Sequence, residues 1–598
     1  MGKLIRFLRN YKKESIISPL FKFFEACLEL IVPLIMAQII DVGILRQDTG
    51  YILSQGAILL LLGVLGLACS LTAQFFAAKA AYGFGTELRR DLFAHIQSLS
   101  YTELDRLGTS TLITRLTADI NQAQNGVNMF LRLFLRSPFI VIGAVIMAFT
   151  INVPMALIFV GAVPVLGLII YAITAYSLPR YRTVQKELDQ VSLATRENLS
   201  GVRVIRAFSR QQGEQENFRR LNEELRGTQM KVGRISALLN PLTYIAVNLA
   251  IVLIVWQGGY KVYNGDITQG EVIALVNYMT QILTALVALA GLIVTLTKAS
   301  ASSRRVQEIF DVKSSMQPGE ELPAASEKGR VEFDHVSMRY HREAEPALQD
   351  ISFRVEPGQT LGIIGGTGDG KSTLVNLIPR FYDVCDGAVL VDGLDVRQYP
   401  MEALRAKIGI VPQKAVLFKG TIRENIRWGA PEASDEEIWR ALEIAQAREI
   451  VEKKPEGLDT VIEQGGANLS GGQRQRLTIA RALVRQPEIL ILDDSASALD
   501  MATDAALRRA IRENTDSMTT LIVSQRVVAI RDADNILVLD DGQLVGQGTH
   551  GELLKTCPVY EEICLSQQQA EDSNDPKDAA LRNSQQQSDG SDGRGAQA

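Results

Sequence analysis

The chain has 598 residues, which is long enough for two or three domains. Lys and Arg total 62 and Asp and Glu total 67, so the formal net charge of −5 gives no support for a nucleic-acid partner. Five cysteines without a close CxxC pair, and only four histidines, favour neither a disulfide framework nor a zinc site.

Apolar runs of membrane-spanning length lie in the first half of the chain, at about 17–42, 53–78, 130–151, 154–177, 241–263 and 271–297. Each has about 20 or more mostly apolar residues, enough to cross about 30 Å of hydrocarbon as a helix. Buried helices of a large soluble protein are the alternative, which six consecutive runs disfavour. The longer loops carry most of the Lys and Arg, so the positive-inside rule places them in the cytosol of a multi-pass protein of the cytoplasmic membrane.

Several charged residues lie inside these runs, where charge is costly. Glu25 and Glu29 are four residues apart on one face of the first run, with Lys22 one turn earlier. Two interpretations stay open: a cavity site for a cationic substrate, or internal pairing with Lys22 extending to the membrane interface. Arg132 and Arg136, at the cytosolic start of the third run, are predicted to be interface anchors.

The two long cytosolic loops, about 82–128 and 178–239, have apolar residues at helical spacing and few Gly or Pro. We therefore expect spans two to five to continue as helices into the cytosol. About 20 added residues would extend each arm by about 30 Å.

The composition changes at 312–328, a polar stretch with two prolines that is typical of a linker. Strand-like runs alternate with helical patterns after it, so we predict a soluble α/β domain over 329–566. The tail at 567–598 is rich in Gln, Ser and Asp and poor in apolar residues, and it is predicted to be disordered.

The stretch LGIIGGTGDGKSTL, residues 361–374, is an apolar strand followed by a Gly-rich loop and the start of a helix. Its spacing matches a P-loop, whose backbone N–H groups hold phosphate oxygens while a lysine reaches the outer phosphates. An acid at Asp369 should repel phosphate unless it points away to solvent. The predicted ATP-binding residues of this loop are Gly365, Gly366, Thr367, Gly368, Gly370, Lys371, Ser372 and Thr373.

Two further motifs follow the P-loop. Asp493 ends the apolar strand ILIL, where its carboxylate and the Ser372 hydroxyl are predicted to hold Mg²⁺. Two glycines and a serine open a helical pattern in LSGGQ and predict a second phosphate-binding surface. One domain needs only one such surface, so we expect it to face the P-loop of another copy or a partner. The predicted signature residues are Ser470, Gly471, Gly472 and Gln473.

On these motifs, in this order and spacing, the chain resembles half-transporters of the ATP-binding cassette (ABC) exporters. The resemblance implies an all-α transmembrane domain of six helices over 1–311, of the type I exporter kind, fused to an α/β P-loop nucleotide-binding domain in the cytosol. It implies ATP and Mg²⁺ as cofactors, with Tyr340 stacking on adenine and Gln413 binding near Mg²⁺. It also implies that Asp500 lies in a loop that crosses a dimer interface.

The same resemblance assigns a task to the long arms. The stretches at 114–124 and 201–208 are similar to the arm tips that dock on the cassettes of such transporters.

Two positions differ from the family pattern for hydrolysis. Asp494 follows Asp493 where a glutamate is expected, and Gln525 stands where the switch motif has histidine. A weaker change is Gln464, just before LSGGQ. Aspartate is one methylene shorter, and a misplaced carboxylate can cost about 100-fold in rate. We therefore predict that this P-loop site binds ATP and hydrolyses it slowly.

An intact signature beside a degenerate site resembles one subunit of the heterodimeric bacterial multidrug-type exporters. That implies a partner half-transporter with the consensus Glu and His, membrane lipid around both, and an amphipathic or drug-like cargo, with lipid or peptide also open. Two alternatives stay open: a regulatory nucleotide-binding membrane subunit that moves nothing, and a slow homodimeric exporter. The six spans exclude a soluble cassette protein of DNA repair or translation.

Overall fold

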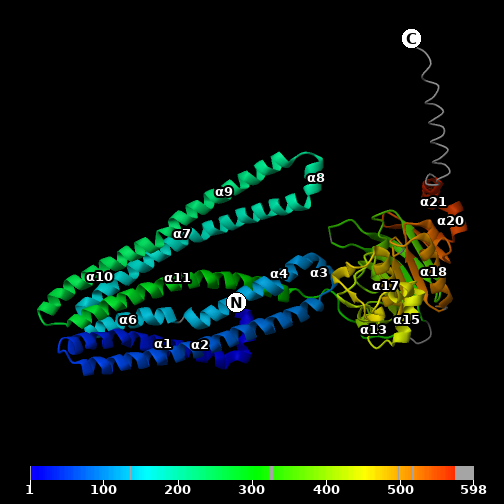
Figure 1. Cartoon of the computed structure of the whole chain (residues 1–598). Helices are drawn as coiled ribbons and strands as arrows, with labels where there is room; N and C mark the ends of the chain where they lie inside the picture. The colour runs from blue at the N-terminus through cyan, green and yellow to red at the C-terminus, as the bar shows by residue number, and fades with distance from the viewer. Residues whose placement is uncertain are drawn as a thin grey trace, which may run out of the picture. The chain divides into compact units, whose positions relative to one another are not determined.

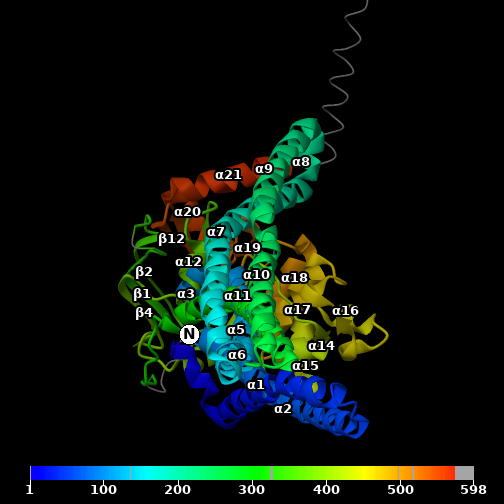
Figure 2. The ribbon, with the colours of Figure 1, turned by 90° about the vertical axis from the view of Figure 1, so that its left-hand side faces the viewer.

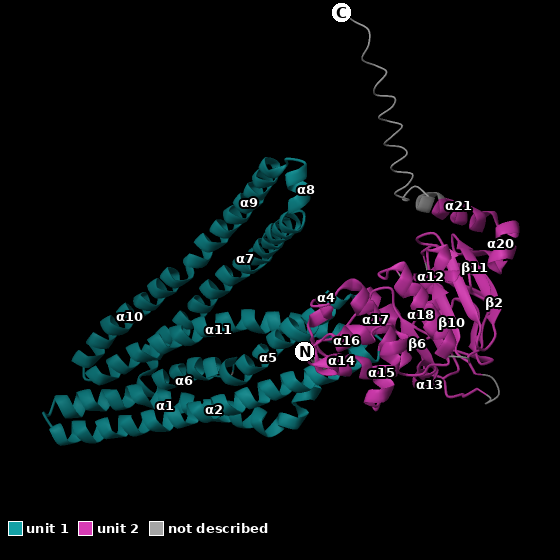
Figure 3. Ribbon diagram, turned by 45° about the vertical axis from the view of Figure 1, so that its right-hand side comes forward, with its two compact units in different colours: residues 1–98, 107–313 teal, residues 99–106, 314–598 magenta. Residues whose placement is uncertain are grey.

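The computed structural model describes residues 2–134, 136–323, 328–341, 343–495, 497–514 and 517–572. The chain divides into two compact units, shown in Figure 3. The first holds residues up to 98 and residues 107–313, and the second holds residues 99–106 and the chain from 314 onward. The predicted linker at 312–328 therefore contains the division between them.

The first unit is helical. Among its described residues, six helical segments are long and apolar enough to cross a membrane: Leu4–Ile44, Thr49–Gln97, Thr109–Ile151, Val153–Ser200, Gln211–Tyr263 and Gln269–Asp311. They contain the helices α1 (Lys12–Gln38), α2 (Thr49–Gln97), α4 (Thr109–Thr114), α5 (Ile120–Met129), α6 (Arg136–Ile151), α7 (Val153–Ser200), α9 (Gln211–Ala237), α10 (Leu239–Tyr263) and α11 (Gln269–Asp311). This confirms the six predicted spans.

The helices run well beyond their apolar parts, as predicted for the arms. Helix α2 has 49 residues and α7 has 48, about twice the length of a span. Helices α7 and α9 lie along one another as far as the short helix α8 (Val202–Ala207), which makes the turn between them (Figures 1 and 2). The predicted arm tip at 201–208 is thus a turn between two long helices.

The charges inside the first span pair with neighbouring side chains. Lys22 Nζ lies 2.6 Å from Glu25 Oε2 and donates to Ser70 Oγ at 3.1 Å. Arg136 Nη2 lies 2.6 Å from Glu29 Oε2. The structure thus has the internal pairing, with Lys22 buried and Arg136 as an ion-pair partner of Glu29. Because the Glu25 carboxylate lies 2.6 Å from the Lys22 ammonium, the charge of Lys22 is paired although the side chain is buried.

Within its described residues, the second unit contains three sheets. The largest has the strand order β12-β11-β3-β10-β9-β6, and a four-stranded antiparallel sheet has the order β2-β1-β4-β5. Strands β7 and β8 form a two-stranded pair. Their bounds are β1 Val331–Met338, β2 Leu348–Val355, β3 Thr360–Gly365, β4 Asp386–Val391, β5 Leu394–Asp395, β6 Ile408–Val411, β7 Gly420–Thr421, β8 Val461–Ile462, β9 Ile489–Asp493, β10 Thr519–Val523, β11 Asn535–Asp540 and β12 Gln543–Gly548.

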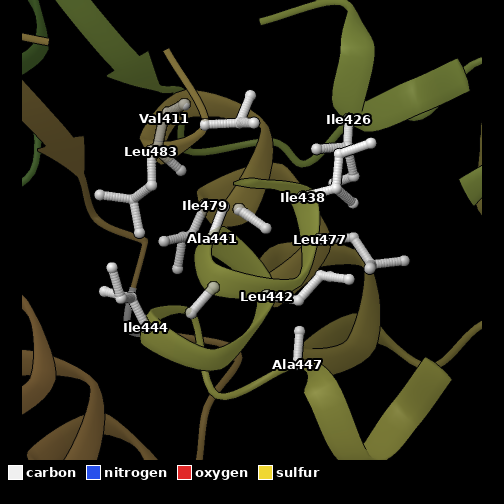
Figure 4. Packing of buried hydrophobic residues seen from close by; sticks show 14 of the residues in the cluster. Val411, Ile426, Ile438, Ala441, Leu442, Ile444, Ala447, Leu477, Ile479 and Leu483 are labelled. Atoms are coloured by element: carbon white, nitrogen blue, oxygen red, sulfur yellow. The ribbon is translucent and has the colours of Figure 1, made fainter. Parts of the chain in front are cut away.

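Helices cover these sheets: α12 (Lys371–Leu377), α13 (Met401–Ala406), α14 (Ile422–Arg427), α15 (Asp435–Ile444), α16 (Arg448–Glu452), α17 (Gly471–Leu483), α18 (Met501–Asn514), α19 (Val527–Ile530), α20 (His550–Thr556) and α21 (Pro558–Asp572). Helices α15 and α17 share one apolar core, to which Ile438 and Leu442 of α15 and Leu477 and Leu483 of α17 belong (Figure 4). This packing fixes the direction of α17, and thereby the place of the signature at its start.

The order of the central strands determines where the site lies. Strands β3, β10 and β9 are neighbours and run parallel. The P-loop follows β3, the switch segment with Gln525 follows β10, and Asp494 follows β9. Since the carboxyl ends of parallel strands meet at one edge, three segments far apart in the sequence come together there.

Both the arm and the tail contain a segment that the sequence did not mark. Residues 99–106, which contain α3 (Tyr101–Leu107) up to Arg106, group with the second unit, whereas 114–124 belong to the first, and the docking of 114–124 on a cassette stays a prediction. Helix α21 continues to Asp572, so the predicted tail begins inside a helix. The apolar residues Tyr560 and Cys564 are buried one turn apart and hold α21 to the domain. Residues 573–598 of the predicted tail lie outside the described residues.

Candidate ATP-binding site

The P-loop connects β3 to α12, as its sequence predicts. Gly368 and Gly370 have positive φ of 105° and 87°, a backbone conformation that favours glycine. A Cβ on Gly370 would lie 2.4 Å from the carbonyl oxygen of Ala347, so a side chain there would also clash. Only glycine therefore gives this loop its shape.

Lys371 turns back over the loop. Its Nζ donates to the carbonyl oxygen of Gly365 at 3.1 Å and, at shorter range, to that of Gly366. Burial lowers the pKa of this ammonium, and the carboxylates of Asp369, Asp494 and Asp493 oppose that shift. Carbonyl oxygens thus hold the ammonium next to the backbone N–H groups that bind phosphate.

Asp369 does not point away from the loop. Its carboxylate accepts a hydrogen bond from the backbone N–H of Gly366, so the acid closes the loop on itself. The sequence left the direction of this side chain open, and the structure gives its carboxylate a local partner, a backbone N–H three residues away.

Ser372 and Asp493 meet as predicted for an Mg²⁺ site. The Ser372 hydroxyl donates to Asp493 Oδ1 at 3.0 Å. Asp493 is buried, and burial raises the pKa of its carboxyl, with the charge of Asp494 adding to the rise and Ser372 and Lys371 opposing it. Hydroxyl, carboxylate and amide oxygens are the hard ligands that Mg²⁺ prefers. The residues present therefore fit this ion.

Tyr340 lies beside the P-loop and is 39% exposed. Its hydroxyl is 2.9 Å from Thr373 Oγ1, and the ring of Tyr382 meets it edge to face at 5.1 Å. The hydrogen bond and the second ring orient Tyr340 and leave part of its surface open to a planar base.

Asp494 and Gln413 lie opposite Lys371. Asp494 has a positive φ of 45°, and its N–H donates to the carbonyl oxygen of Val523 at 3.0 Å. Gln413 Nε2 donates to Asp494 Oδ2 at 3.3 Å. The short side chain of Asp494 is thus held toward Gln413, and its backbone is hydrogen-bonded to the end of β10.

These side chains line one cavity of about 310 Å³, together with Ala347, Val523 and Ser524. Gln525 is exposed at its edge. Of the predicted residues, the structure brings together Tyr340, Thr367, Gly368, Gly370, Lys371, Ser372, Thr373, Gln413, Asp493, Asp494 and Gln525. Ala347, Val523 and Ser524 carry no signal in the sequence that marks them as lining residues.

The signature forms the first turn of α17, and none of its residues lines that cavity within the described part of the chain. Ser470 is the N-cap: its hydroxyl accepts from the N–H of Gln473 at 3.3 Å, and its own N–H donates to Gln473 Oε1 at 3.0 Å. Gly471 is exposed, and the backbone between the two capping side chains is bare. Asp500 is likewise a cap, accepting from the N–H of Thr503 at 2.9 Å.

Comparison with known proteins agrees with this geometry. The family described as ABC transporter transmembrane region matches residues 15–286, and the family described as ABC transporter matches residues 348–497. The fold resembles the structure of a bacterial Atm1-family ABC exporter with ATP bound, with a TM-score of 0.78 at 24% identity, covering 93% of this chain and 99% of that chain.

Relatives match along nearly the whole length. An uncharacterized ABC transporter ATP-binding protein of Bacillus subtilis, YfiB, is 40% identical over 569 residues, which is 95% of this chain and 98% of that protein. A fatty acid ABC transporter ATP-binding/permease protein of Mycobacterium bovis is 35% identical over 477 residues, 80% of this chain and 75% of that protein. With six apolar helices and an ATP-binding cassette in one polypeptide, the chain is a multi-pass protein of the cytoplasmic membrane and belongs to the ABC transporter family.

Proposed function

We propose that this chain is one half of a heterodimeric ABC exporter, whose own P-loop site binds Mg-ATP and hydrolyses it slowly. The observation that carries the proposal is the pair Asp494 and Gln525 at the edge of an otherwise complete ATP cavity. The groups for binding are present, and only the two that act on the attacking water and the γ-phosphate depart from the family pattern.

Binding draws on the loop and its neighbours. The backbone N–H groups of the loop and the Lys371 ammonium take the phosphates, and Tyr340 takes the adenine. Ser372 and Asp493 would hold Mg²⁺, which neutralises charge on the β- and γ-phosphates. The loop carbonyls release Lys371 to the phosphates when ATP enters, since a charged acceptor makes the stronger hydrogen bond.

Hydrolysis needs a carboxylate that orients water beside the γ-phosphate. Asp494 is one methylene shorter than glutamate and accepts from Gln413, which keeps it back from the phosphate. A shortfall of about 1 Å can cost about 100-fold in rate. Gln525 can donate a hydrogen bond but carries no charge. Both changes act on the transition state rather than on ATP binding.

The signature supports the partner half of the proposal. Ser470 and its glycines open α17 away from the chain's own cavity, so they are available to a second cassette. ATP would then lie between the P-loop of one chain and the signature of the other. This chain's intact signature would complete a site on a partner half-transporter that has the consensus Glu and His.

For cargo we propose amphipathic molecules with long apolar parts, exported from the cytosolic side. The support is the relative named a fatty acid transporter, which matches 80% of this chain. The pairing of Lys22 with Glu25 and of Arg136 with Glu29 leaves the first span without a net charge that would select a cation.

The test is the Mg-ATPase rate of the purified chain beside the double variant Asp494→Glu, Gln525→His. We expect slow turnover in the native chain and a rise of about 100-fold in the double variant. ATP binding should be equal in both, measured with a fluorescent ATP analogue, and Lys371→Ala should abolish it. Rapid ATP hydrolysis by the native chain that Lys371→Ala abolishes would instead indicate a self-sufficient homodimer and contradict the proposal.

A further inference from the structure

The last helix of the chain reaches the segment that carries Gln525. Gln567, on α21, donates from Nε2 to the carbonyl oxygen of Gln525 at 2.7 Å. Its Oε1 accepts from the backbone N–H of Val527 at 2.9 Å. One side-chain amide, 40 residues further along the chain, therefore uses both of its polar atoms on the switch segment.

The backbone at this place has few other constraints. The segment leaves β10 at Val523 and enters the short helix α19 at Val527, whose N-cap Arg526 makes no side-chain capping bond. Ser524 supports it from the other side, since its N–H donates to Ile363 at 3.1 Å and its Oγ accepts from Arg526 at 3.0 Å. Between these two anchors stands Gln525, whose carbonyl is the one that Gln567 holds.

Helix α21 is itself fixed firmly enough to act as a support. Tyr560 and Cys564 are buried in a cluster that includes Val527 and Ile530 of the segment's own helix. The hydroxyl of Tyr560 lies 2.8 Å from Nδ1 of His550 on α20. Gln567 lies one turn beyond Cys564, on the side of the helix that faces the switch segment.

We propose that Gln567 is a positioning residue for ATP hydrolysis. It fixes the backbone at Gln525, and thereby sets how the side chain at position 525 meets the γ-phosphate. The inference rests on the proposed ATP hydrolysis at this site. It holds whether that site is slow or fast, because the two hydrogen bonds of Gln567, here called the clamp, act on the backbone and not on the side chain at position 525.

The expected kinetic signature follows from what Gln567 touches. Its hydrogen bonds go to the backbone of Gln525 and Val527, and among the described residues none goes to Tyr340, the P-loop, Ser372 or Asp493. Loss of the clamp should therefore lower kcat by about threefold to tenfold, the range for one net hydrogen bond. The KM for Mg-ATP should stay within about twofold.

The experiment uses the full chain with three variants: Gln567→Ala, which removes both bonds; Gln567→Glu, which keeps an acceptor but sets a second acceptor against the Gln525 carbonyl; and Gln568→Ala, an exposed neighbour, as the matched control. The first readout is hydrogen–deuterium exchange of the amides at 524–530 in nucleotide-free protein. We expect Val527 to exchange at least about threefold faster in Gln567→Ala and to stay slow in Gln567→Glu and in Gln568→Ala.

The second readout is steady-state ATPase activity, in the native chain and in the Asp494→Glu, Gln525→His background. A fall in kcat with unchanged KM in both Gln567 variants, and none in Gln568→Ala, supports the positioning role. Unchanged exchange at Val527 in Gln567→Ala overturns it, and so does faster exchange with unchanged kcat in the active background. If the native chain hydrolyses ATP too slowly to assay, that result concerns only the proposed function. Hydrogen–deuterium exchange at Val527 still tests whether Gln567 holds the backbone.

Discussion

Tyr382 attaches the arm segment 99–106 to the nucleotide-binding domain, and we predict that removing its hydroxyl loosens this attachment. The Tyr382 hydroxyl donates to Asp105 Oδ2 at 2.6 Å. The ring of Tyr101 packs on Phe381 at 4.7 Å between centroids. Burial and the Asp105 carboxylate both raise the pKa of Tyr382, so the hydroxyl keeps its proton and stays a donor across the neutral range.

The size of the effect follows from these contacts. A hydrogen bond to a charged acceptor contributes about 1.5–3 kcal/mol, and the exposure of Asp105 places this one near the lower end. Tyr382→Phe keeps the ring and its packing, so the change isolates the hydroxyl. Since 1.4 kcal/mol is tenfold in an equilibrium, the undocked population of 99–106 should rise about tenfold.

Hydrogen–deuterium exchange of peptides covering 99–107 measures that population directly. Tyr399→Phe is the matched control, because the Tyr399 hydroxyl donates to the carbonyl oxygen of Val391 at 2.8 Å in the core of the same domain. Faster exchange at 99–107 in Tyr382→Phe alone is the expected result. If both variants accelerate it equally, the effect is general destabilisation; if neither does, Tyr382 is not the attachment, and either result refutes the reasoning.

Three further changes test the ATP site and the membrane domain. Asp493→Asn should raise the melting midpoint of the nucleotide-free chain by about 2–4 °C, because it removes a charge whose burial costs about 1 kcal/mol of folding free energy. Burial raises the pKa of Asp493, so the contribution of this carboxyl to stability is fully present below its ordinary pKa and is lost as pH rises through the raised pKa; calorimetry should find this component of the pH dependence absent in Asp493→Asn. Ser372→Ala should weaken Mg²⁺-dependent ATP binding about tenfold in equilibrium titration, and leave metal-free binding nearly unchanged. Lys22→Met should lower the melting midpoint, because Glu25 loses its nearer cation and keeps only Arg136 at 3.8 Å, and Lys22→Met with Glu25→Gln should restore most of the loss.

Patterns confined to one stretch of chain predicted the site well. The apolar strand, glycine loop and helix start at 361–374 specify β3, the P-loop and α12, and the run ILIL places Asp493 at the end of β9. Because β3 and β9 both run parallel to β10 between them, the P-loop and Asp493 then lie at the same edge of the sheet. A local pattern suffices here because each motif requires its own backbone conformation, such as the positive φ at Gly370.

The sequence alone did not predict contacts between segments that lie far apart in the chain. Helical periodicity marks both 99–106 and 114–124 as helix, but it does not say which of them packs with the second unit. The polar composition after residue 566 hid Gln567, because composition reports the average of a segment and the clamp depends on one side chain. The hydrogen bond from Lys22 to Ser70 likewise carries no signal in the sequence, because Ser70 lies 48 residues away on another helix.

The departures at Asp494 and Gln525 are confined to the groups that act in the transition state, and this restriction is itself an argument. A cassette released from all constraint would also be free to lose its loop glycines, the Ser372 hydroxyl or the capping box at Ser470, and each of these is present and correctly placed. The binding groups that are present suit a site that ATP occupies, and the capped signature suits a P-loop on a second cassette. Both features support the proposed arrangement, in which this site would hold ATP while a second site hydrolyses it.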